Sequence, residues 1–127
     1  MTRLLLDTNV VWRLFYEVDK LRPDTVRILA RPDAELFYSP LSLAELVVKR
    51  QAGKLRFDEG ELVTALDSNS VRELPVRSRH AVRVGTLPLL HKDPFDRLII
   101  AQALEENMPL VSADAIFPKY GVTVIRA

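Results

Sequence analysis

Four acidic residues could together bind a divalent cation. Asp7 and Asp114 each end an apolar run, LLLD and LVSAD, while Glu45 and Asp96 lie on predicted helices, on faces shared with apolar residues. Two carboxylates ~5 Å apart repel by about 3 kcal/mol at an effective dielectric of 20, a large share of a domain's net stability of ~5–15 kcal/mol. If the four converge, a divalent cation or strongly raised pKa values must relieve the repulsion. Oxygen ligands without cysteine or paired histidines favour Mg²⁺ or Mn²⁺ over Zn²⁺.

Two of the acids in HKDPFDRLIIAQA, residues 91–103, also fit an ordinary helix start. Asp93 stands where an N-cap belongs, Pro94 at the first helical position and Asp96 at the third. The predicted helix 94–106 is apolar nearly all round and should be deeply packed. A carboxylate on its first turn is therefore expected to be partly buried, which capping does not require.

The other three acids have structural explanations as well. Glu45 lies in mid-helix, where no cap explains it, and could form a salt bridge with Lys49 or with an arginine elsewhere, because buried carboxylates are costly unless paired. Asp7 and Asp114 could cap the segments that follow them. Each acid alone is weak evidence, and only their convergence would indicate a metal site.

Alternating strands and helices predict how the acids are brought together. The expected strands are 3–7, 34–39, 71–76, 108–114 and 121–127, and the expected helices are 8–17, 22–31, 40–54, 58–69, 78–87 and 93–107. This alternation predicts an α/β fold with a mostly parallel sheet. Ligand crevices in such sheets border the carboxyl ends of the strands. Asp7 and Asp114 are therefore expected at that edge.

The composition limits the class of protein. The 127 residues predict a single domain, 1–127, and the absence of cysteine excludes disulfides and thiolate metal sites. The net charge of +1 is small for a strongly basic nucleic-acid binder, although an acidic pocket with a basic rim remains possible. No apolar run approaches the ~18–20 residues of a membrane span, and no signal-peptide pattern is found. We expect a soluble cytoplasmic protein with no membrane contact.

Five segments occur in an order that resembles a known family: LLLDTNVV, SPLSLAELVVKRQAGKL, LPLLHKDPFDRLIIAQA, PLVSAD and YGVTVI. From Leu4 to Ile125 the chain is similar to PIN-domain proteins, close to the VapC-type toxins of bacterial type II toxin–antitoxin systems. The resemblance implies a three-layer α/β/α sandwich around a central, mostly parallel sheet of four to five strands. It also implies a Mg²⁺- or Mn²⁺-dependent endoribonuclease that hydrolyses RNA phosphodiester bonds with metal-activated water.

The same resemblance implies roles for individual residues. The catalytic acids would be Asp7, Glu45, Asp96 and Asp114, and the metal ligands among them Asp7, Asp96 and Asp114. The accessory residues would be Asp93, Ser112 near the metal, and Thr8 and Asn9 after the first aspartate.

RNA and protein partners are also implied. Flanking cations are needed to position the RNA phosphates beside a negative pocket, and the candidates are Lys49, Lys92 and Arg97. Surface charge is the simpler explanation for each of them. Arg97 could instead pair with an acid. His91 could contact RNA or form a structural hydrogen bond. The family further implies a homodimer and a VapB-like antitoxin, for which apolar surface on helices 8–17 and 24–31 is the expected site.

Two other classes of protein are alternatives. A phospho-accepting receiver domain shares the fold class, but it needs an acidic pair after the first strand, an aspartate after the third and a lysine after the fifth. The corresponding segments here are DTN, VRELPV and VTVI, and they supply none of these residues. A catalytically silent PIN-like binding module is the second alternative. Metal binding without cleavage would favour that module.

Overall fold

A five-stranded parallel sheet forms the centre of the protein. The computed structural model describes residues 2–127, and its strand order is β3-β2-β1-β4-β5. The strands are β1 (Thr2–Leu6), β2 (Ala34–Tyr38), β3 (Arg72–Glu73), β4 (Leu110–Ser112) and β5 (Val124–Arg126), and every pairing is parallel. Its middle strand, β1, ends in three fully buried leucines because helices cover both faces. The predicted parallel sheet is confirmed.

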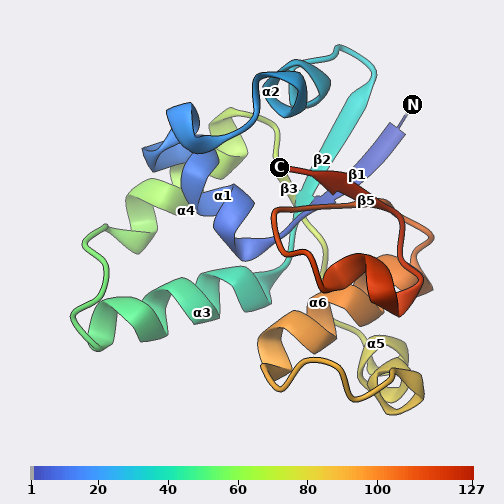
Figure 1. Cartoon of the computed structure of the whole chain (residues 1–127). Helices are drawn as coiled ribbons and strands as arrows, with labels where there is room; N and C mark the ends of the chain where they lie inside the picture. The colour runs from blue at the N-terminus through green and yellow to red at the C-terminus, as the bar shows by residue number, and fades with distance from the viewer. Residues whose placement is uncertain (1) are drawn as a thin grey trace.

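Within residues 2–127, six α-helices flank the sheet, and three short 3₁₀ turns connect elements (Figure 1). The helices are α1 (Thr8–Tyr16), α2 (Pro23–Leu29), α3 (Pro40–Gln51), α4 (Glu59–Ser68), α5 (Ser78–Arg83) and α6 (Pro94–Glu105). The 3₁₀ turns are η1 (Val18–Lys20), η2 (Val84–Thr86) and η3 (Phe117–Tyr120). None of the helices described for residues 2–127 is long and apolar enough to cross a membrane.

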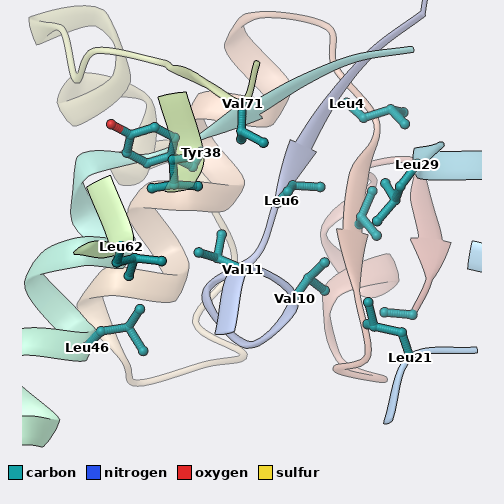
Figure 2. Close-up of a cluster of buried hydrophobic side chains, with 13 residues drawn as sticks. Leu4, Leu6, Val10, Val11, Leu21, Leu29, Tyr38, Leu46, Leu62 and Val71 are labelled. Atoms are coloured by element: carbon teal, nitrogen blue, oxygen red, sulfur yellow. The ribbon is translucent and has the colours of Figure 1, made fainter. Parts of the chain in front are cut away.

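The two faces of the sheet carry separate hydrophobic clusters. Because successive strand side chains point to opposite faces, Leu4 and Leu6 pack against α1, α2, α3 and α4, whereas Leu5 packs against α6. Figure 2 shows the first cluster, in which Leu46 of α3 and Leu62 of α4 lie together, with Val11 of α1 between them and Leu6. Helix α5 contacts α6 in the second layer. The predicted three-layer sandwich is therefore confirmed.

Several predicted boundaries were wrong for local reasons. Strand 71–76 shortens to β3 because Pro75 has no N–H to continue the ladder after Leu74 N donates to Tyr38 O at 2.8 Å. Strand 121–127 begins only at Val124, since Gly121 (φ +80°) ends the unpredicted turn η3. Helix 78–87 ends at Arg83 and continues as η2.

Candidate metal centre

Asp7 lies where β1 turns into α1, and it is almost fully buried. Its backbone takes the N-cap position of α1, and its Oδ1 accepts a hydrogen bond from Thr8 N at 2.8 Å. Its Oδ2 accepts one from Ser112 Oγ, at the end of β4, at 2.9 Å. Burial raises the pKa of Asp7 to about 6 although these two hydrogen bonds oppose the rise, and the negative charges of Glu45 and Asp114 add to it. The predicted capping role and the predicted place at the sheet edge are therefore both observed.

Asp96 lies on the first turn of α6 and faces the other acids. Burial of its carboxyl is the largest cause of a pKa raised to about 8. The remaining causes are four neighbouring carboxylates, namely Asp7, Asp93, Glu45 and Asp114. The structure thus brings together the four acids singled out in the sequence and adds Asp93 to them. Asp93 also caps α6 as predicted, since its Oδ1 accepts from Phe95 N at 2.9 Å.

Glu45 forms the predicted salt bridge and also lies beside the other acids. Glu45 lies in the middle of α3 and is 9% exposed. Its Oε2 lies 3.1 Å from Lys49 Nζ, which is the predicted salt bridge. Its Oε1 accepts from the Thr8 hydroxyl at 3.1 Å, which ties α3 to the start of α1. The same carboxylate raises the pKa of Asp7 and Asp96. Pairing with Lys49 therefore does not remove Glu45 from the acidic cluster.

Asp114 follows β4 and is held by the backbone around it. Its Oδ1 accepts from Ile116 N at 3.0 Å, and its own N donates to Ser112 Oγ at 3.1 Å. Ser112 thereby links Asp7 and Asp114 through one hydroxyl. Asn9 is exposed on α1, next to Thr8.

The ligand atoms fit a small divalent cation. Two sets of side chains have donor atoms within 4.8 Å of one another: His91 with Asp96 and Asp114, and Glu45 with Asp93 and Asp96. Both sets are rich in carboxylate oxygen, as Mg²⁺ and Mn²⁺ prefer, and a cation would relieve the charge repulsion at Asp96. Neither set includes Asp7, whose two oxygens already accept from Thr8 and Ser112.

Comparison with known proteins identifies the family. The sequence model of the PIN domain matches residues 4–122. The chain belongs to the PIN domain family. Among curated proteins, no significant match was found.

Solved structures share the fold of this PIN domain. VapBC2 from Rickettsia felis, bound to a DNA fragment from its promoter, gives a TM-score of 0.74 at 19% identity, covering 98% of each chain. DNA-bound VapBC from Salmonella typhimurium gives 0.68 at 13%, covering 99% of this chain and 98% of that one. VapBC-5 from Mycobacterium tuberculosis gives 0.64 at 21%, covering 100% of both. At these identities the likeness establishes the fold.

Sequence reasoning missed the position of His91 in this PIN domain. The structural hydrogen bond offered for it is observed, since its Nδ1 accepts from Asp93 N at 3.2 Å. Its contact with the acids was not predicted: Nε2 lies 3.1 Å from Asp96 Oδ2 and 3.4 Å from Asp114 Oδ2. The available signal was its place two residues before Asp93 and five before Asp96 in HKDPFD.

The three basic residues near the acids lie in different settings. Lys49 pairs with Glu45, and Lys92 is exposed in the loop before α6. Arg97 points elsewhere, because its Nη1 donates to Pro88 O at 2.9 Å and its Nη2 to Val84 O at 3.3 Å. Its guanidinium thus holds the loop between α5 and α6 and does not pair with an acid in these contacts.

Proposed function

We propose that this PIN domain is a Mg²⁺- or Mn²⁺-dependent endoribonuclease and the toxin of a type II toxin–antitoxin pair. The observation that carries the proposal is the meeting of five carboxylates at one edge of the sheet, where burial and then the four neighbouring acids raise the pKa of Asp96 to about 8. Such a cluster costs stability unless it binds a cation, so a functional role accounts for it better than a structural one. Membership of the PIN family supports nuclease chemistry at this site.

The residues divide into groups by their contacts. Asp96 and Asp114 would hold the cation, with Asp7 as the third ligand that the family resemblance implies, although Asp7 belongs to neither set of converging donor atoms. Glu45 and Asp93 lie beside Asp96 from α3 and the start of α6. When bound, the cation supplies a more acidic water and neutralises charge that develops on the phosphate. Ser112 and Thr8 orient Asp7 and Glu45 through their hydroxyl groups. Hydrolysis would leave a 5′-phosphate and a 3′-hydroxyl on the RNA.

We also propose that the protein binds a VapB-like antitoxin and forms a homodimer, both in the cytoplasm. Support comes from the VapBC complexes that share the fold. An apolar groove between α1, α2 and β2 lies on the surface expected for the antitoxin and is lined by Leu14, Phe15, Val26, Leu29 and Leu36. An amphipathic antitoxin helix would fit such a groove.

RNA cleavage in cells tests the nuclease proposal directly. Induced expression of the wild type is expected to create new RNA ends with 5′-phosphates within minutes, and Asp7→Asn is expected to create none at equal protein levels. Sequencing of 5′ ends before and after induction measures both. Identical new ends with the two proteins would contradict the proposal. Metal binding by the purified wild type without cleavage would instead favour the silent binding module.

Lys92 and Arg97 are expected to respond differently to loss of charge. Lys92→Gln should weaken RNA binding and lower the slope of log K against log salt by about 0.7–1, because one phosphate contact is lost, while stability stays unchanged. Arg97→Gln should lower the free energy of unfolding by ~1–2 kcal/mol, because two backbone carbonyls lose their donor. Filter binding at several salt concentrations, together with urea unfolding, separates the two effects. Equal salt slopes for wild type and Lys92→Gln would remove Lys92 from the RNA site.

A further inference from the structure

The imidazole of His91 has a fixed donor and a fixed acceptor. The backbone N of Asp93 lies 3.2 Å from His91 Nδ1. A backbone N–H can only donate, so Nδ1 must be the unprotonated nitrogen. In the neutral ring the proton is therefore on Nε2. Nδ1 thus accepts a hydrogen bond from the loop, and Nε2 carries the single N–H of the ring.

The edge of the ring that carries Nε2 lies close to two of the proposed metal ligands. Nε2 lies 3.1 Å from Asp96 Oδ2 and 3.4 Å from Asp114 Oδ2. The two carboxylates come from different elements, the first turn of α6 and the segment after β4. The ring also packs edge-on against Phe117, with centroids 6.2 Å apart at 63°, and Phe117 is fully buried. His91 is therefore held on the side of the loop and on the side of η3.

We propose that His91 is a positioning residue, whose Nε2–H orients the carboxylates of Asp96 and Asp114 for the cation without becoming a ligand itself. The inference rests on the proposed function. Asp114 shows the effect most clearly, because Ile116 N holds its Oδ1 at 3.0 Å while His91 faces its Oδ2. Each carboxylate oxygen keeps a second lone pair, which remains available to a cation.

Direct ligation by His91 is disfavoured by the same geometry. A metal ligand needs the lone pair of Nε2, so the neutral ring would have to carry its proton on Nδ1. Nδ1–H would then face the N–H of Asp93, and two donors would meet where one hydrogen bond existed. The loop before α6 opposes that change, because Arg97 fixes it through the carbonyls of Val84 and Pro88.

Two substitutions separate the loop contact of His91 from its contact with the acids. In His91→Asn the amide oxygen can still accept from Asp93 N, but the side chain is too short to reach the acids. In His91→Gln the longer amide can place an N–H near the position of Nε2. We expect His91→Asn to weaken Mg²⁺ binding ~10–100-fold, as loss of a hydrogen-bond partner to a metal ligand typically does, and His91→Gln to restore most of it. Calorimetric titration with Mg²⁺ measures both, and the melting temperature of the metal-free variants should stay near that of the wild type.

Nitrogen NMR of the wild type provides a test that needs no variant. The chain has two histidines, and His80 is an internal control, since its Nδ1 accepts from Arg77 N and its Nε2 contacts Glu106, which lies outside the acidic cluster. We expect both rings to keep the proton on Nε2 at saturating Mg²⁺, with shift changes at His91 alone. A move of the His91 proton to Nδ1 would show direct ligation and overturn the inference.

The titrations also separate this inference from the proposed function. Equal Mg²⁺ affinity in wild type and His91→Asn would overturn the role of His91 and leave the metal site standing. Tighter binding by His91→Asn would overturn it too, because the imidazole would then compete with the cation. A wild type that binds no Mg²⁺ or Mn²⁺ would overturn both proposals.

Discussion

Asp96→Asn is expected to lower RNA cleavage by at least ~100-fold and, at the same time, to stabilise the metal-free protein at pH 8. The loss of activity should exceed the 10–100-fold typical of losing a residue behind a metal ligand, because Asp96 belongs to both sets of converging donor atoms. The gain in stability follows from its pKa of about 8, since asparagine removes the charge that burial and four neighbouring acids disfavour. We expect a gain of a few kcal/mol, with about 6 kcal/mol as the upper bound that a shift of about four pKa units gives at about 1.4 kcal/mol for each unit.

Asp58→Asn is the matched control for this substitution. Asp58 is exposed and caps α4 by accepting from Glu61 N at 2.9 Å, and asparagine caps a helix equally well. Its substitution should leave cleavage unchanged and stability within ~0.5 kcal/mol. Cleavage of a labelled RNA and urea unfolding with chelator measure the two properties. Full activity in Asp96→Asn, or a loss of stability, would show that its carboxylate serves the fold.

The sheet and most of its helices could be predicted because local patterns specify them. Leu4, Leu5 and Leu6 form an apolar run that only a strand covered on both faces can bury. Proline at the first position and a capping side chain mark the starts of α3 and α6. The short β3 was harder, because its length depends on where Pro75 meets the neighbouring strand.

The acidic cluster was predictable from the sequence, but the contacts around it were not. Asp7 and Asp114 follow strands, so topology alone brings them to one edge. His91 reaches the cluster only because the preceding loop folds back, and Arg97 holds that loop through carbonyls that no side-chain pattern reveals. For the same reason Arg97, predicted beside the RNA, faces Val84 and Pro88. The roles of His91 and Arg97 therefore depend on how the loop between α5 and α6 folds and not on the residue types alone.

The metal-free protein is expected to lose stability as the pH rises from about 4 to 8. Unfolded, Asp7 and Asp96 have a pKa of 3.8, whereas folding raises the two values to about 6 and about 8. Well below pH 3.8 both carboxyls are protonated in the folded and in the unfolded state, so they cause no loss of stability there. Between pH 3.8 and the raised pKa values the folded state holds more protons than the unfolded state, so the free energy of unfolding falls as the pH rises. The fall should reach several kcal/mol in total, because each pKa unit of the two shifts counts about 1.4 kcal/mol. Thermal unfolding with chelator from about pH 4 to 9 measures this loss.

Mg²⁺ is expected to reverse that loss, and more strongly at high pH. The cation binds the ionised carboxylates and stabilises the folded state by RT ln(1 + [L]/Kd), so protonation at pH 5 should weaken its effect relative to pH 8. In Asp96→Asn the free energy of unfolding should no longer fall above about pH 6, and the fall caused by Asp7 should remain. Asp58→Asn should reproduce the wild-type dependence on pH. A flat profile in the wild type, or equal stabilisation by Mg²⁺ at both pH values, would mean that neither burial nor mutual repulsion disfavours the charged acids at the sheet edge. The electrostatic reason for a cation at this site would then be gone.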